Sequence, residues 1–120
     1  MEGKMKGKMM KRAQFAVAIA FLLGAHLALA QGGDAKAGKA IFDKQCATCH
    51  GPDGTPKDAV AKMLKVEMRH LGSQEVQAKS DADIRKIVTE GYNKMRPQKL
   101  ADKDLANVIA HLRTLKPLKQ

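Results

Sequence analysis

Cys46-Ala47-Thr48-Cys49-His50 contains both cysteines of this chain and places a histidine directly after the second one. If the stretch is helical, residues three and four positions apart share one face, so the two thiols and the imidazole project to the same side. The thiols can then reach the two vinyl groups of one porphyrin while the imidazole points at its iron. This CxxCH spacing is typical of covalent haem attachment. We therefore predict one haem c, bonded to Cys46 and Cys49, with His50 as the proximal axial ligand of the iron.

Two other interpretations of a CxxC pair are less consistent with the sequence. A thioredoxin-like redox pair belongs to a βαβ unit, and no strand-like alternation surrounds these cysteines. Half of a zinc site would need two further ligands. They would have to come from among His50, His70 and His111, which stand at none of the familiar zinc spacings. The histidine that directly follows the second cysteine therefore favours haem.

The first thirty residues have the pattern of a secretory signal peptide. Five basic residues precede an apolar run over residues 15–29, and Ala28-Leu29-Ala30 supplies a small-x-small cleavage site. The alternative is an uncleaved membrane anchor, but the run is shorter than the roughly 20 residues that span a bilayer. We therefore predict a cleavable signal peptide at residues 1–30 and a mature domain at residues 31–120 without a membrane span.

The mature segment is small, basic and poor in aromatic residues. Its 90 residues are enough for one small domain, and Phe42 and Tyr92 are its only Phe, Tyr or Trp side chains. It carries 17 Lys and Arg against 11 Asp and Glu, a net charge of +6. Because base-stacking aromatics are missing and the basic residues are scattered, we predict no nucleic-acid binding. A chain this small buries a modest part of its surface, so we expect a haem to complete its core.

Capping residues and hydrophobic periodicity predict an all-α domain. Asp34 is placed to cap a helix that runs toward the motif, and the turn-rich stretch 51–56 must end that helix. Asp58 is predicted to cap a short helix, and Ser73 to start another short turn before Ser80. The apolar residues of the short helix after Asp58 are Val60, Met63 and Leu64.

The last two predicted helices are amphipathic. Ser80 and Asp83 form a capping pattern ahead of an apolar stripe. In the final helix, Asp102 and Asp104 lie where the positive end of the helix dipole favours carboxylates, and Pro117 is expected to end the helix. The apolar stripe of this helix consists of Leu105, Val108, Ile109, Leu112 and Leu115.

The sixth ligand of the iron decides what the haem can do. Met95 is the predicted distal ligand, because it lies in a loop between two helices and a loop residue can be aimed at the iron. Thioether sulfur also raises the potential of a haem. The alternative is that Met95 only packs. The other candidates are Met63, which we expect in the core, Met68, which fits no clear pattern, His70, which would give a bis-histidine haem, and His111, which we expect at a packing or surface position.

Short segments spread along residues 34–116 follow one known pattern. They are Gly38 with Phe42, Asp53-Gly54, Leu64-Lys65-Val66, Glu90 to Met95, Leu100 to Leu105, and Leu112 to Leu115. With the CxxCH motif, they make the chain resemble class I monohaem c-type cytochromes of the small bacterial kind. The resemblance implies a cytochrome c domain with three main helices and short turns around one covalent haem. It also implies that the first and last helices cross at Gly38, where a glycine permits close approach, and that Met95 is distal.

The chain departs from that family pattern at three points. Such proteins usually have proline directly after the distal methionine, whereas Arg96 stands between Met95 and Pro97. The last helix usually carries an aromatic residue against the first helix, and His111 stands there instead, which suggests a weaker crossing or a hydrogen bond. A proline carbonyl normally orients the proximal histidine, and we assign this role to none of the nearby prolines.

The resemblance implies an electron carrier rather than an enzyme, because an iron with both axial positions filled cycles between oxidation states without binding a substrate. The carrier would shuttle electrons between redox partners in the bacterial periplasm, where the signal peptide would deliver it. The alternatives are a haem-based ligand sensor and an electron-transfer subunit of a larger oxidoreductase. Basic residues could steer acidic partner surfaces toward the haem, or form an ordinary solvated surface. These residues are Lys44, Lys57, Lys94, Arg96 and Lys99.

Overall fold

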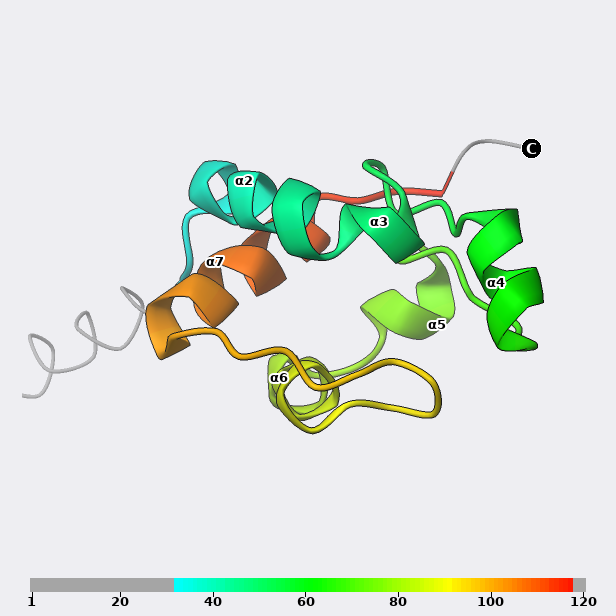
Figure 1. Ribbon diagram of the computed structural model, residues 1–120. Helices are drawn as coiled ribbons and strands as arrows, with labels where there is room; N and C mark the ends of the chain where they lie inside the picture. Colours follow the sequence, from blue (N-terminus) through cyan, green and yellow to red (C-terminus); the bar gives the residue numbers. More distant parts are fainter. Residues whose placement is uncertain (1–31, 118–120) are drawn as a thin grey trace, which may run out of the picture. The chain divides into compact units, whose positions relative to one another are not determined.

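The structure, a computed structural model, describes residues 32–117. The predicted signal peptide lies outside these described residues. Within them the chain forms six helices, and its one piece of β structure is an isolated bridge between Tyr92 and Met95. This confirms the predicted all-α fold. The helices are α2 (Ala35–Gln45), α3 (Ala47–His50), α4 (Asp58–Leu64), α5 (Gln74–Gln77), α6 (Asp81–Glu90) and α7 (Asp102–Leu112), as Figure 1 shows.

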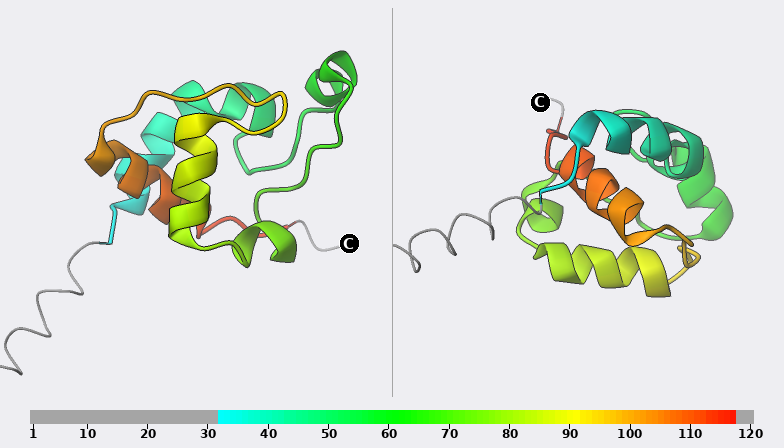
Figure 2. Two further views of the ribbon diagram at one scale, coloured as in Figure 1. Left: turned by 90° about the horizontal axis from the view of Figure 1, so that it is seen from below. Right: turned by 90° about the vertical axis from the view of Figure 1, so that its left-hand side faces the viewer.

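The longest helices are α2, α6 and α7, which correspond to the three main helices expected from the sequence. The first and last of them, α2 and α7, pack along each other, and α6 packs against α7 from the other side (Figure 2). The remaining helices are short segments in the connections. None of the helices between residues 32 and 117 is long and apolar enough to cross a membrane.

Helix α2 begins at the predicted cap and is tied to α7 from its first residue. The Asp34 carboxylate accepts hydrogen bonds from the backbone N–H groups of Lys36 at 2.8 Å and Ala37 at 3.2 Å. The backbone N–H of Asp34 itself donates to the side-chain oxygen of Asn107 on α7, at 2.8 Å. Asn107 is buried, so this bond fixes the start of α2 against the final helix.

The crossing of α2 and α7 is close, as the glycine at position 38 predicted. Gly38 is buried, and a Cβ atom at this position would overlap the backbone carbonyl of Asn107. One turn later Phe42, only 1% exposed, meets the His111 ring edge-on with the ring centroids 5.1 Å apart. His111 is therefore a packing residue. Its buried Nε2 atom has no hydrogen-bond partner, so the hydrogen bond suggested for this position does not form at Nε2.

The hydrophobic core lies between α6 and α7. Ile84 and Val88 of α6 contact a stripe of α7 that includes Leu105, Ile109 and Leu112. This confirms the predicted apolar stripes except at Leu115, which lies beyond the end of α7 and is only partly buried. Partly buried apolar residues pack around this cluster, and they are Leu71, Val76, Met95, Leu100 and Leu115.

The caps of the middle helices also follow the sequence. Ser73 accepts a hydrogen bond from the N–H of Val76 at 3.4 Å and starts the short helix α5. Ser80 accepts from the N–H of Asp83 at 3.0 Å, and its hydroxyl donates to the Asp83 carboxylate at 2.7 Å. This pairing is the predicted capping pattern at the start of α6.

Three local expectations are wrong. Asp58 does not cap α4, because Lys57 occupies the N-cap position and Asp58 is the first helical residue, where its charge meets the positive end of the helix. Met63 is not in the core, since 72% of it is exposed. Helix α7 ends at Leu112, well before Pro117.

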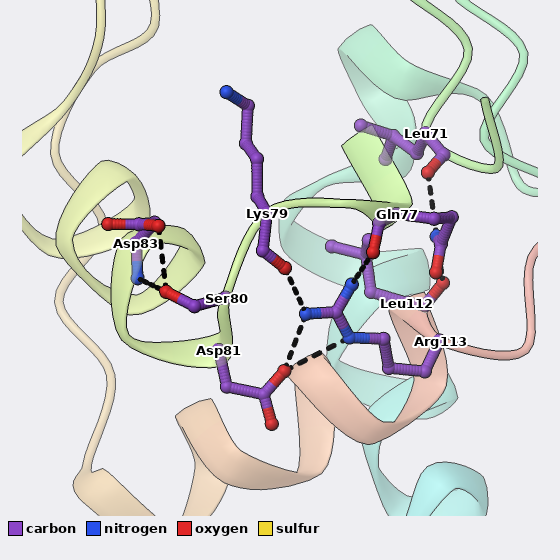
Figure 3. A network of polar contacts seen from close by, with 8 residues as sticks. All are labelled: Leu71, Gln77, Lys79, Ser80, Asp81, Asp83, Leu112 and Arg113. Carbon is purple, nitrogen blue, oxygen red and sulfur yellow. Dashed lines mark hydrogen bonds and ion pairs between the residues drawn. The ribbon is translucent and has the colours of Figure 1, made fainter. Parts of the chain in front are cut away.

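Arg113, directly after α7, joins the end of the chain to the α5–α6 connection (Figure 3). Its guanidinium donates to the Asp81 carboxylate, to the Gln77 carbonyl at 2.9 Å and to the Lys79 carbonyl at 2.6 Å. The Gln77 side chain donates in turn to the carbonyl of Leu112 at 3.0 Å. These contacts hold α5 and the start of α6 against the last turn of α7.

The close crossing predicts that Gly38→Ala is destabilising. The added methyl group would collide with the Asn107 carbonyl, and relief requires a shift of the α2 or α7 backbone. We expect a loss of about 1–3 kcal/mol in the free energy of unfolding, measured by urea denaturation of the haem-loaded protein. Gly32→Ala is the control, because a Cβ at Gly32 meets no atom within 4 Å. A Gly38→Ala variant as stable as this control would contradict the close crossing.

The buried histidine at the crossing predicts a specific acid sensitivity. Desolvation lowers the pKa of His111 from its ordinary 6.5; the charge of Lys39 lowers it further and that of Asp43 opposes the shift. The folded state then binds fewer protons than the unfolded state. The contribution of His111 to the free energy of unfolding is therefore complete above about pH 6.5. It declines as the pH falls toward the lower pKa that His111 has in the folded state.

Replacing His111 by phenylalanine removes this proton uptake. We expect His111→Phe to lose less unfolding free energy than the wild type between about pH 7 and about pH 5, measured by urea denaturation at each pH. Equal losses in the two proteins would show that the histidine is not responsible.

Candidate functional site

The CxxCH stretch forms a single helical turn at the end of α2. Cys46 is the C-cap residue of α2, and its backbone N–H donates to the carbonyl of Phe42 at 2.8 Å. The N–H of His50 donates to the carbonyl of Cys46 at 3.0 Å. The two thiols and the imidazole therefore come from one continuous turn, as their spacing predicted. Gly51 ends the turn with a φ of +69°, a left-handed backbone conformation that glycine adopts without strain.

The environment of the two cysteines does not suit a redox pair or a zinc site. Both thiols are free and half-buried. Burial, and in second place the charge of Cys49, raises the pKa of the Cys46 thiol to about 11, whereas the attacking cysteine of a redox pair has a lowered pKa. Between residues 32 and 117 no three His, Cys, Asp or Glu side chains gather in a way that could hold a metal ion. The zinc and thioredoxin interpretations therefore lose support.

His50 is partly buried, and its ring is neutral and incompletely hydrogen-bonded. Its side chain is largely enclosed, and burial lowers its pKa, which favours the neutral ring that binds iron. Its Nδ1 atom is buried and has no hydrogen-bond partner. Two thiols and one neutral imidazole on the same turn form the donor set that a covalent haem requires. The residues present therefore fit this cofactor.

Two backbone hydrogen bonds fix the loop that leaves the motif. The N–H of Lys57 donates to the carbonyl of Cys49 at 3.1 Å, and the N–H of Leu71 donates to the carbonyl of Gly54 at 3.0 Å. Asp53 holds the turn between them by accepting from the N–H of Thr55 at 2.9 Å. The CxxCH turn is thus anchored on both sides, by α2 before it and by this loop after it.

Met95 lies in a tight turn that begins at Tyr92. The backbone groups of Tyr92 and Met95 exchange two hydrogen bonds, of 3.1 and 2.9 Å, and Asn93 takes a left-handed conformation between them. Lys94 and Arg96 on either side are exposed, whereas Met95 is half-buried and packs against the α6–α7 core cluster. The turn therefore directs the methionine inward and its basic neighbours outward.

The loop that carries Met95 faces the CxxCH turn across the molecule. In Figure 1 this loop runs below α3, and in the view from below it passes in front of the same region (Figure 2). The predicted site residues thus come from two places: Cys46, Cys49 and His50 share one turn, and Met95 arrives on a separate loop from the second half of the chain.

The other candidate ligands are placed less favourably. Met63 is exposed, and His111 is buried in the α2–α7 crossing. Met68 is half-buried outside any helix. The Nδ1 atom of His70 accepts a hydrogen bond from the N–H of Gly72 at 2.8 Å, so a neutral His70 ring carries its proton on Nε2. This tautomer has no free lone pair for iron at Nε2.

Comparisons with known proteins agree with this arrangement. A family model described as "Cytochrome C oxidase, cbb3-type, subunit III" matches residues 33–112. Cytochrome c-554(547) of Halothiobacillus neapolitanus is 31% identical over 91 residues, which cover 70% of this chain and 99% of that protein. Among solved structures, the c-type cytochrome KustC0563 is 31% identical with a TM-score of 0.58, and the match covers 67% of this chain and 98% of that chain.

A helical domain in which α2 packs along α7 and leads directly into a CxxCH turn is a c-type cytochrome. This chain belongs to the cytochrome c family that the matched model represents. Membership brings one covalent haem c with its iron, and a function in haem-based electron transfer.

Proposed function

We propose that this cytochrome is a mobile electron carrier whose iron is held by His50 and Met95, with thioether bonds to Cys46 and Cys49. The observation that carries the proposal is the Tyr92–Met95 turn, which points a thioether inward on the loop opposite the CxxCH turn. When bound, haem supplies an iron that changes between its ferrous and ferric states. With His50 and Met95 holding the iron, no substrate would reach it, and the protein would carry electrons without catalysing a reaction.

The anchored surroundings of both ligands suit fast electron transfer. His50 is fixed between α2 and the Lys57–Cys49 hydrogen bond. The exit of the Met95 loop is fixed by a hydrogen bond of 2.8 Å from the N–H of Gln98 to the carbonyl of Val88 on α6. A backbone held in this way would keep His50 and Met95 in place when the charge of a bound iron changes. A haem sensor needs a vacant or easily vacated position, and the tight turn at Met95 favours the carrier.

A second candidate is an electron-transfer subunit of a larger oxidoreductase. The description of the matched family, which names an oxidase subunit, favours it. Copurification separates the two: a subunit remains with its complex, and a carrier is recovered alone.

The proposed location is the bacterial periplasm, reached by means of the signal peptide at residues 1–30, with cleavage after Ala30. Covalent attachment of haem at CxxCH in the bacterial proteins that this chain resembles takes place outside the cytoplasm. The partners are then other exported redox proteins.

The surface charge supports partners with acidic docking surfaces. Five basic residues near the motif and the Met95 loop are exposed, and none of them forms an ion pair with another residue of the described part of the chain. They are Lys44, Lys57, Lys94, Arg96 and Lys99. Unpaired charges of one sign attract an oppositely charged partner over roughly the Debye length, about 10 Å at 0.1 M salt.

The ligand assignment predicts a change of spectrum in Met95→Ala. We expect the wild-type ferric protein to be low-spin and to show the weak long-wavelength absorption band of sulfur bound to ferric haem, and the variant to lose that band. Met63→Ala is the matched control, because Met63 is exposed and its removal should leave the spectrum unchanged. A high-spin wild type, or a Met95→Ala variant that retains the band, would falsify the carrier with His/Met ligation.

The docking proposal predicts that association with an acidic redox partner slows as salt is added, because salt screens the attraction between exposed charges. The second-order rate constant for electron transfer to an acidic partner protein measures this. We expect Lys94→Gln with Arg96→Gln to lower the rate constant severalfold at low salt, and Lys36→Gln, at the far end of α2, to leave it unchanged. A rate constant that does not depend on salt would contradict the proposal that surface charges steer the partner.

A further inference from the structure

The residues that follow α7 pack against loops from the first half of the domain. We call residues 113–116 the C-terminal segment. The N–H of Leu115 donates to the carbonyl of Leu112 at 3.2 Å, so the segment turns directly off the helix. A Cβ atom on the buried Gly72 would lie 2.7 Å from backbone atoms of Lys116. The matched family model ends at residue 112, so the C-terminal segment lies outside the part of the chain that this model describes.

The side chain of Leu115 closes a small enclosure around Gly54. Gly54 is buried and has a φ of +84°, which favours glycine. A Cβ atom built there would lie 3.0 Å from the Leu115 side chain and 3.1 Å from that of Leu71. The His70 ring lies on a third side, 3.6 Å from the same position. Leu115 also packs against the α6–α7 core cluster, so it joins the loop around Gly54 to the core.

Gly54 is bonded in turn to the end of the CxxCH turn. Its N–H donates to the carbonyl of Gly51 at 3.3 Å, and Gly51 directly follows His50. A Cβ atom on the buried Gly51 would overlap the carbonyl of Thr55, so the loop is also closely packed on itself. A displacement of Gly54 is therefore transmitted to the backbone beside His50.

Hydrogen bonds hold the C-terminal segment against the support of this loop. The Gln77 side chain donates to the carbonyl of Leu71 at 2.9 Å and to that of Leu112 at 3.0 Å, as Figure 3 shows. The N–H of Leu71 binds the Gly54 carbonyl at 3.0 Å. Gln77 thus links the residue that holds Gly54 to the end of α7, from which the C-terminal segment leaves.

We propose that Leu115 is a positioning residue for the proximal ligand: by holding Gly54, it fixes the loop that follows His50 and keeps water out of it. The proposal rests on the proposed ligation of the iron by His50 but not on the identity of the distal ligand. Contacts that fix a metal-bound imidazole, and the apolar shell that controls access of solvent, both tune the potential of a metal centre. Leu115 acts on the iron in this way, through the loop.

The variant Leu115→Ala tests the contact with the loop. The amides of Lys57 and Leu71 bond to the carbonyls of Cys49 and Gly54, so their exchange with solvent reports on how often the loop opens. We expect both amides to exchange about tenfold faster in the haem-loaded variant, because truncation of a packed leucine removes apolar contacts and leaves a cavity.

Two further measurements on the same variant report on the iron. The spread of the haem methyl proton resonances in the ferric protein depends on the orientation of the axial imidazole, and we expect this spread to change. The reduction potential should fall, because water that enters the loosened loop stabilises the more highly charged ferric state.

Two control variants separate positioning from general loss of packing. Leu115→Met keeps an apolar side chain of similar volume and should remain close to the wild type in all three measurements. Leu100→Ala makes the same truncation in another partly buried leucine of the same core cluster, one that does not contact Gly54. It should leave the exchange of the Lys57 and Leu71 amides unchanged.

The outcomes distinguish a positioning residue from a packing residue. Exchange rates in Leu115→Ala that equal those of the wild type, or that rise equally in Leu100→Ala, overturn the proposal. Faster exchange with an unchanged methyl spread and potential also overturns it, because Leu115 then only packs. If the His50 ring protons of the wild type show no shift caused by the iron, the ligation in the proposed function fails, while the exchange rates still test the contact between Leu115 and the loop.

A measurement on the unaltered protein applies even if Leu115→Ala does not fold. Exchange measured at increasing denaturant concentration groups amides by the opening that exposes them. The amides of Lys57, Leu71 and Leu115 should share one opening, with a lower free energy than the opening that exposes α7. If the Leu115 amide opens independently of the other two, the proposal is wrong.

Discussion

The contact between α2 and α7 is the constraint on which the rest of the domain depends. Gly38 lets the two backbones approach until only a hydrogen atom fits between them, and Asn107 fastens the start of α2 by its side chain. Phe42 and His111 fill the next turn of the crossing. Because Cys46 directly follows α2, the position of the CxxCH turn is set by this crossing. Helix α2, which leads into the CxxCH turn, is thus held in place by α7.

The protein core is small for a domain of this length. Its buried apolar residues lie on α2, α6 and α7, and the short helices α3, α4 and α5 contribute no fully buried residue. The segments without buried residues include the CxxCH turn itself. A planar apolar macrocycle attached to that turn would give these segments something to pack against, since the chain has few aromatic side chains of its own. The small number of core residues is therefore consistent with a domain whose core is completed by its cofactor.

Short sequence patterns predicted the structural features that depend on neighbouring residues, namely helix caps and helix faces. The caps at Asp34, Ser73 and Ser80 follow from short-range hydrogen bonds, and they were confirmed. The apolar stripe of α7 follows from helical periodicity, and it was confirmed as far as Leu112, where the helix ends. Met63 was misplaced because periodicity defines a helix face without saying whether another element covers it.

Contacts distant in sequence could not be predicted in the same way. The Arg113 network joins groups more than thirty positions apart. For the site, the spacing of CxxCH was sufficient to place three side chains on one turn. The inward direction of Met95 depends on how the Tyr92 turn docks against the α6–α7 core, which no short motif encodes.

The hydrogen bond between Asp34 and Asn107 spans 73 positions of the chain, so this contact joins the first and the last helix within residues 32–117. A polypeptide made from its N-terminus exposes the CxxCH turn long before α7 exists. Folding with such distant partners is slow to complete, because the loop between them must first be closed. The topology therefore leaves the CxxCH turn without the helix that closes the domain until the end of the chain has been made.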